Sequence, residues 1–312
     1  MNILLVICIA LVAGLLMTRL MKVIGLPNVT GYLIIGIILG PCCFKIINHT
    51  DLDGVFNIIT EVALAFIAFS IGVEFKISSF KRIGKNIFVI TLTQALTTTL
   101  LVDAVLITLA LTTDLIPLPV AICLGAIATA TAPAATLMVV RQYKAHGPVT
   151  ETLLPVVALD DAVGLMVFSV SIALAEVFAS GTPITFTAIV LEPLLEIVLS
   201  LAIGAALGFI LSLSTKIFKS RANRLTACIA VVFAGCGITM IEGLSLSSLL
   251  VCMMIGAIYC NFFKESDVIM EQCDRWTTPL FILFFIISGA SLDIFNIIHV
   301  GVIGIIYVLV RA

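Results

Sequence analysis

Apolar residues run along this chain in long stretches, which charged residues, prolines and glycines interrupt at intervals. A hydrocarbon core about 30 Å thick is crossed by a helix of about 20 apolar residues, and the stretches have about this length. Eleven spans can be marked, at residues 3–21, 29–48, 55–76, 86–112, 117–140, 149–178, 184–216, 224–241, 245–263, 276–292 and 296–312. The pattern therefore predicts an all-α polytopic membrane protein.

Composition supports a membrane environment and excludes several other classes. Of the 312 residues, 62% are hydrophobic and 11% are charged, whereas soluble domains have about 45–50% and about 25%. The net charge is −2 and no block of Lys or Arg occurs, so we expect no nucleic-acid partner. The nine cysteines lack the spacing of metal ligands or of a disulfide framework. We therefore expect no bound cofactor or resident metal.

The distribution of basic residues predicts the orientation. Of the 16 Lys and Arg residues, all but Lys45 and Arg311 fall in the segments that follow odd-numbered spans. Basic residues concentrate on the cytoplasmic side of membrane proteins. We therefore expect an N-terminus outside the cell.

An internal repeat is also visible. The stretch FSIGVEFKISSFKRIG (69–84) resembles IISGASLDIFNIIHVG (286–301), which places Gly72 over Gly289; residues 25–40 match 243–259 more weakly. The second copy begins seven spans later, so it enters the membrane inverted, as in many secondary transporters. We expect one repeat at about 1–178, a linker helix at 184–216 and a partial second repeat at about 224–312. The same offset places further helices beyond Ala312, and we expect 13 in a complete protein; chance similarity of apolar segments is the alternative.

Two adjacent acids, Asp160 and Asp161, lie near the middle of the sixth span. An ionised carboxylate at that depth costs roughly 2.5–3.5 kcal/mol on insertion scales. Such a pair suits the exchange of a proton for a cation, because the same oxygens can hold either. The structural alternative is an ion pair that only fastens helices together, but the fourth, fifth and sixth spans contain no basic residue at that depth.

The fifth span carries Pro133 in its middle, with Thr129 and Thr131 just before it. Proline removes a backbone donor and clashes with the preceding turn, so we expect a helix break there. Broken helices are tolerated in lipid only where protein or a cavity surrounds them. The freed carbonyls and the threonine hydroxyls are hard oxygen ligands for a monovalent cation; a simple kink is the alternative.

Three further polar positions stay open. Arg311 of the eleventh span is either a basic partner that approaches the aspartate pair or the cytoplasmic anchor of its helix. Asp103 faces a vestibule or reaches the interface. Gln94 is a candidate to line a path, together with Thr91 and Thr93; the alternative for helical threonines is a bond to their own backbone.

Five motifs together resemble a known family: GLPNVTGYLIIGIILGP (25–41), FIAFSIGVEF (66–75), ATATAPAA (128–135), LDDAVGLMVF (159–168) and LFFIISGASLD (283–293). Their order is similar to that in bacterial monovalent cation:proton antiporters of the second cation:proton antiporter family, the sodium/hydrogen exchanger type. The resemblance implies a homodimer with a moving core domain. It also implies that Asp161 binds cation and proton, that Asp160 accompanies electrogenic exchange, and that Thr129 and Thr131 belong to the unwound crossover.

The resemblance implies a transporter and not an enzyme, which exchanges Na⁺ or Li⁺ for H⁺. Potassium-efflux members usually carry Gln before the aspartate, where this chain has Asp160. A K⁺/H⁺ antiporter, a sodium-coupled symporter and a non-transporting sensor or assembly subunit remain as alternatives. An intramembrane aspartyl protease needs its two acids on two facing helices, and here both lie in one span.

Overall fold

The computed structural model describes residues 2–48, 52, 54–73, 77–113, 115–180, 191–241, 246–263 and 266–311; the side chains of some helical residues, including Asp161 and Pro133, lie outside this description. In these ranges the chain is helical and forms no strand. The helices are α1 (Ile3–Ile24), α2 (Asn28–Leu39), α4 (Val55–Val73), α5 (Ile77–Thr112), α6 (Leu118–Thr129), α7 (Pro133–Tyr143), α8 (Pro148–Ser180), α9 (Glu192–Ile217), α10 (Arg221–Thr239), α11 (Ser248–Phe262), α12 (Ser266–Ala290) and α13 (Ile294–Arg311).

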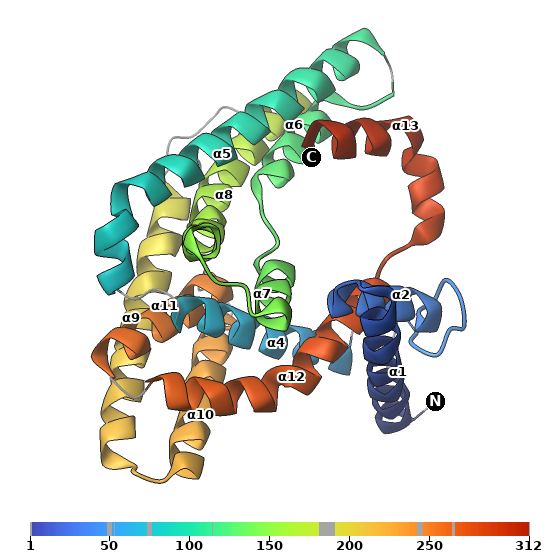
Figure 1. The fold of residues 1–312 in the computed structure, drawn as a ribbon. Coiled ribbons are helices and arrows are strands. Elements are labelled where there is room, and N and C mark those ends of the chain that lie inside the picture. The colour runs from blue at the N-terminus through green and yellow to red at the C-terminus, as the bar shows by residue number, and fades with distance from the viewer. Residues whose placement is uncertain are drawn as a thin grey trace.

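The helices form two groups (Figure 1). In the smaller group α5 packs against α6, α8 and α13, around a core that includes Val102, Leu106 and Ala128. In the larger group α11 packs against α4 and α9, while α12 packs against α2 and α4. Helix α7 touches α8 on one side and α2 and α4 on the other, so it joins the two groups.

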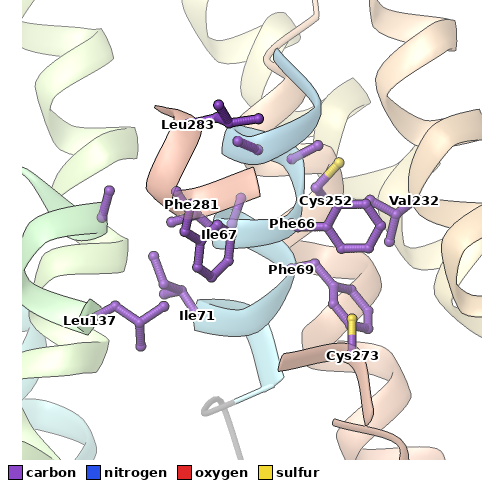
Figure 2. Close-up of a cluster of buried hydrophobic side chains, with 14 of the residues drawn as sticks. Phe66, Ile67, Phe69, Ile71, Leu137, Val232, Cys252, Cys273, Phe281 and Leu283 are labelled. Atoms are coloured by element: carbon purple, nitrogen blue, oxygen red, sulfur yellow. The ribbon is translucent and has the colours of Figure 1, made fainter. Parts of the chain in front are cut away.

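Helix α4 occupies the centre of the larger group. Phe66, Ile67, Phe69 and Ile71 are buried on different sides of it (Figure 2). They meet side chains from four other helices: Leu137 of α7, Val232 of α10, Cys252 of α11, and Cys273, Phe281 and Leu283 of α12. A helix that is hydrophobic all round is buried inside protein, so α4 forms the core of this group.

Two helix crossings in the larger group are built in the same way. Where α2 crosses α12, a Cβ atom on Gly36 would lie closer than 3.0 Å to the carbonyl oxygen of Ile286. Where α11 crosses α4, a Cβ atom on Gly256 would lie equally close to the carbonyl oxygen of Phe69. Small residues of this kind let helix backbones approach closely in membranes.

Each partner helix contributes a glycine as well. Gly289 of α12 lies against the backbone of Leu33, and Gly72 of α4 lies against the backbone of Met253. Both glycines are the last residue but one of their helices. The matched contacts support the proposal that α2 with α4 and α11 with α12 are copies of one unit, while the repeat boundaries stay predictions.

Several predicted span limits are wrong. The second span ends at Leu39 and not at 48, because Gly40 is extended before Pro41 and the amides of Ile46 and Ile47 return to the Leu39 carbonyl. The tenth begins at Ser266 and not at 276, and Arg275, expected in a loop, lies inside α12, 2.7 Å from Glu271. Hydropathy detects the apolar part of a helix and misses its polar extension.

Two other helices also differ from their predicted spans. Helix α5 begins at Ile77, ahead of residue 86, so the charged residues 81, 82 and 85 are helical. The eleventh span is kinked at Gly301, whose φ of 48° and ψ of −126° are not helical. Residues 184–190 of the predicted linker helix lie outside the described part, and the described α9 begins at Glu192.

By length and apolar composition, six described helical spans could cross a membrane, with α6 and α7 counted as one; a seventh results if the two halves of the bent α8 are counted together. The apolar helices α2 and α11 are shorter than such a span. The count of eleven spans therefore stays a prediction.

Candidate functional site: a helix break facing a buried aspartate

The fifth predicted span is broken in its middle. Helix α6 ends at Thr129, α7 begins at Pro133, and the residues between are not helical. Ala130 and Ala132 have extended backbones, with ψ of 135° and 98°. Pro133 takes the first position of α7, where its missing N–H interrupts no helical hydrogen bond. The break brings the C-terminus of α6 and the N-terminus of α7 together, so carbonyls of one half-helix and amides of the other lack helical partners.

Helix α8, which packs along α6, is bent near the aspartates. Its segments Pro148–Val157 and Ala162–Ile172 meet at 42°, and Asp160 and Asp161 lie between them. Pro155 lies on the turn before. The acids therefore belong to an irregular part of α8 beside the break of its neighbour.

Asp160 is completely buried, with 0% of its surface exposed. Its Oδ2 accepts a hydrogen bond of 2.5 Å from the Thr131 hydroxyl, which comes from the break between α6 and α7. Its Oδ1 is buried and has no hydrogen-bond partner among the described residues. Buried polar atoms are nearly always satisfied, so an orphaned carboxylate oxygen calls for a proton, a water molecule or an ion.

Helix α5 contributes two side chains that meet the crossover threonines. The Thr99 and Thr129 hydroxyl oxygens are 2.6 Å apart, and both residues are buried. The Gln94 amide nitrogen donates to the Thr131 hydroxyl over 3.4 Å. Sequence reasoning overlooked Thr99 and proposed for Gln94 only that it lines a path. The same stretch also holds Thr91, Thr93, Thr97 and Thr98. No sequence signal therefore singled out Thr99 and Gln94.

Arg311 reaches the helix break. It is an exposed residue at the end of α13, and its guanidinium donates a 3.0 Å hydrogen bond to the carbonyl oxygen of Ala130. It also acts electrostatically on Asp160. The structure thus places Arg311 at the crossover, bound to a carbonyl and not to the carboxylate.

The remaining candidate residues are placed as follows. The backbone of Asp161 lies in α8, but its side chain is outside the description. Asp103 of α5 lies against Gly125 of α6, with its Oδ1 buried and unpartnered within the described part. Among the described residues, no group of three or more His, Cys, Asp and Glu side chains is arranged to hold a metal ion.

A separate cavity of about 980 Å³ lies where α7 ends and α8 begins. Polar contacts between the two helix groups line it. Arg141 of α7 forms an ion pair of 2.6 Å with Asp274 of α12, and the backbone amide of Asn28 in α2 donates to the Gln142 side chain at 2.8 Å. These contacts tie the end of α7 to the larger group.

The arrangement has the chemistry of a small-cation and proton site. A buried carboxylate, a hydroxyl and the carbonyls of an unwound segment are oxygen ligands, and they are placed at the ends of half-helices as in secondary transporters. Comparison with known proteins points the same way. Residues 7–312 match the family model described as sodium/hydrogen exchanger, transmembrane. No match is found among curated proteins.

Two solved structures share the fold. One is the sodium proton antiporter MjNhaP1 from Methanocaldococcus jannaschii at pH 8, with a TM-score of 0.76 and 20% identity, covering 100% of this chain and 76% of that chain. The other comes from a 3D EM map of MjNhaP1 from the same organism, with a TM-score of 0.78 and 19% identity. This match covers 98% of this chain and 73% of that chain. The family match spans nearly the whole chain, so this multi-pass membrane protein belongs to the sodium/hydrogen exchanger family of cation:proton antiporters.

Proposed function

We propose that the protein exchanges Na⁺ or Li⁺ for H⁺ across the membrane, and that cation and proton compete for one aspartate, Asp161. The observation that carries this proposal is the environment of the adjacent Asp160 carboxylate. This carboxylate is fully buried, held on one oxygen by Thr131 of the broken helix, and unpartnered on the other among the described residues.

Competition follows from the cost of an empty site. An ionised carboxylate at membrane depth costs roughly 2.5–3.5 kcal/mol, so an unoccupied and charged site is disfavoured. A proton on the carboxylate or a cation beside it removes this cost, and each excludes the other because both use the same oxygens. A site of this kind exchanges its two occupants one for the other.

The alternative of a structural ion pair lacks its basic partner. A fastening role for Asp160 requires a Lys or Arg on its carboxylate, and a buried charge without such a partner is destabilising. In the described part of the chain no basic side chain forms an ion pair with Asp160; Arg311 bonds the Ala130 carbonyl instead. This favours a site that a mobile cation or proton fills.

We assign separate roles to the two acids, following the family resemblance. Asp161 binds the transported cation and the proton, and Asp160 makes the exchange electrogenic. Thr129 and Thr131 supply oxygens of the unwound segment. Arg311 is the basic group that competes with the cation, and its bond to the break supports this role. Replacing Arg311 with Gln should therefore lower the charge moved per exchange cycle.

The test is exchange by the reconstituted protein in vesicles with a pH-sensitive dye. Asp161→Asn should abolish cation-dependent proton flux. Asp160→Asn should retain flux while the membrane current disappears. Glu271→Gln is a matched control, because it also neutralises a carboxylate but removes only an exposed ion pair with Arg275. Normal flux in Asp161→Asn would refute the assignment.

The same vesicles identify the cation. Proton flux driven by Na⁺ and Li⁺ but not by K⁺ is the expected result. The K⁺/H⁺ antiporter, which the sequence left open, would show the opposite preference. The absence of flux with all three ions would favour a non-transporting sensor or assembly subunit.

We further propose that the protein lies in the bacterial inner membrane with its N-terminus outside, and that it forms a homodimer. The concentration of basic residues after odd-numbered spans supports the orientation. The dimer rests on the family resemblance, and crosslinking in intact membranes tests it.

A further inference from the structure

We propose that Gln94 of α5 is a positioning residue of the cation site, which together with Asp160 holds the Thr131 hydroxyl in place. The inference deepens the proposed function and rests on it. Its starting point is the pattern of burial along α5. The neighbours Phe88, Val89, Ile90 and Leu96 are exposed to the surroundings, whereas Gln94 is half-buried and turned toward the helix break.

The chemistry of the three groups fixes the direction of their hydrogen bonds. A hydroxyl has a single proton, and Thr131 donates it to Asp160 Oδ2. An amide NH₂ group can only donate, so Gln94 occupies a lone pair of the Thr131 oxygen. Gln94 therefore contacts Thr131, which donates to Asp160, and Gln94 also lies close enough to act on the Asp160 carboxylate directly. Successive bonds of this kind polarise one another, and the last is strengthened by the charge of its acceptor.

Helix α5 orients the other crossover threonine by the same logic. The Thr99 hydroxyl donates to the Ala95 carbonyl of its own helix at 3.0 Å, which uses its only proton. Thr129 must therefore be the donor across the 2.6 Å contact between the two hydroxyls. Both threonine hydroxyls beside the break are thus set by side chains of α5, and Gln94 is the one connected to Asp160.

A fixed hydroxyl leaves a defined acceptor for a cation. The Thr131 hydroxyl donates its proton to Asp160, and the Gln94 amide occupies one lone pair of its oxygen, so the other lone pair is free for a cation. Asp160 Oδ1, which has no hydrogen-bond partner among the described residues, is a second acceptor at the site. Without Gln94 the Thr131 hydroxyl keeps only its bond to Asp160 and can swing about it, so part of the cation's binding energy is spent on ordering the hydroxyl. The loss should appear in cation affinity and leave the maximal rate of exchange unchanged.

The test replaces Gln94 with Met, which has a similar length but no donor. A lost hydrogen bond weakens affinity by about fivefold, so the apparent KM for Na⁺ should rise by about that factor with a maximal rate within about twofold of wild type. Gln94→Asn keeps the amide but shortens its reach, and it should show the same rise. Thr91→Val is the matched control, because the buried Thr91 hydroxyl donates to Ile87 of its own helix.

A double variant separates positioning from a general structural role. If Gln94 acts partly through Thr131, then Gln94→Met combined with Thr131→Val should raise the KM by less than the product of the two single effects. Additive effects, an unchanged KM, or a loss confined to the maximal rate would overturn the inference. If the wild-type protein exchanges no cation, the proposed function fails and this inference with it; normal wild-type exchange with an unchanged KM in Gln94→Met refutes this inference alone.

Discussion

The glycine crossings give a quantitative prediction about stability. At Gly36 an alanine Cβ would meet the backbone oxygen of Ile286, which cannot rotate away, so α2 and α12 must separate. Overpacking of this kind costs about 1–3 kcal/mol, whereas a helical Gly→Ala change by itself gains about 0.5–1 kcal/mol. We expect a net loss of about 1–2 kcal/mol. Gly256→Ala should cost the same, because its Cβ meets the equivalent oxygen of Phe69.

Thermal unfolding of the purified protein in detergent measures the effect. A chain of this size changes its Tm by roughly 2 °C per kcal/mol, so both variants should unfold about 2–4 °C lower. Gly237→Ala is the matched control: Gly237 is helical and exposed, and a Cβ there meets nothing within 4 Å. It should raise the Tm slightly. If all three variants shift the Tm in the same direction, the close backbone approach does not limit packing at these crossings.

Three further predictions follow from other contacts. Arg141→Gln should lower the free energy of unfolding by about 1 kcal/mol or less, because the ion pair with Asp274 is partly exposed. Exchanging the two residues, with Arg141→Asp and Asp274→Arg in one chain, should restore part of this stability, and thermal unfolding measures both effects. Gly125→Ala should lower the free energy of unfolding by about 1 kcal/mol, less than Gly36→Ala, because the added Cβ meets the Asp103 side chain and not a backbone oxygen. In a double-mutant cycle, Asp103→Ala should remove this loss of stability. A membrane-impermeant maleimide should label the exposed Cys43 in intact cells, and labelling only after permeabilisation would contradict an N-terminus outside.

The helix break could be predicted from the sequence because its cause is local. Pro133 cannot continue a helix, and the structure ends α6 and begins α7 around it. The burial of Asp160 was also expected, since an acid within a long apolar span has little access to water. The limits of α5 and α12 were missed for the converse reason: charged turns extend these helices beyond the apolar part, where hydropathy carries no signal.

The partners of the site could not be predicted because they depend on how helices pack. Thr131 bonds Asp160 although 29 residues separate them, and Arg311 reaches a carbonyl 181 residues away. Periodicity shows that a side chain faces a neighbour but not which neighbour it faces. Gln94 was therefore visible only as one of several polar residues in its span, and its link to Thr131 required the packing of α5 against the helix break.

The division of contacts between the helix groups bears on how the site gains access to both sides. The described hydrogen bonds among Gln94, Thr131 and Asp160 lie within the segment that contains α5 to α8, and α5, α6 and α8 pack together. The described ties of α7 to the larger group lie elsewhere: Leu137 packs beside α4, and Arg141 meets Asp274 at the cavity. A displacement of the smaller group as a unit would carry the three site residues together and keep their geometry, while the ties around the cavity would break. Polar and partly exposed contacts of this kind are individually weak, whereas at the glycine crossings of the larger group the helix backbones lie in direct contact.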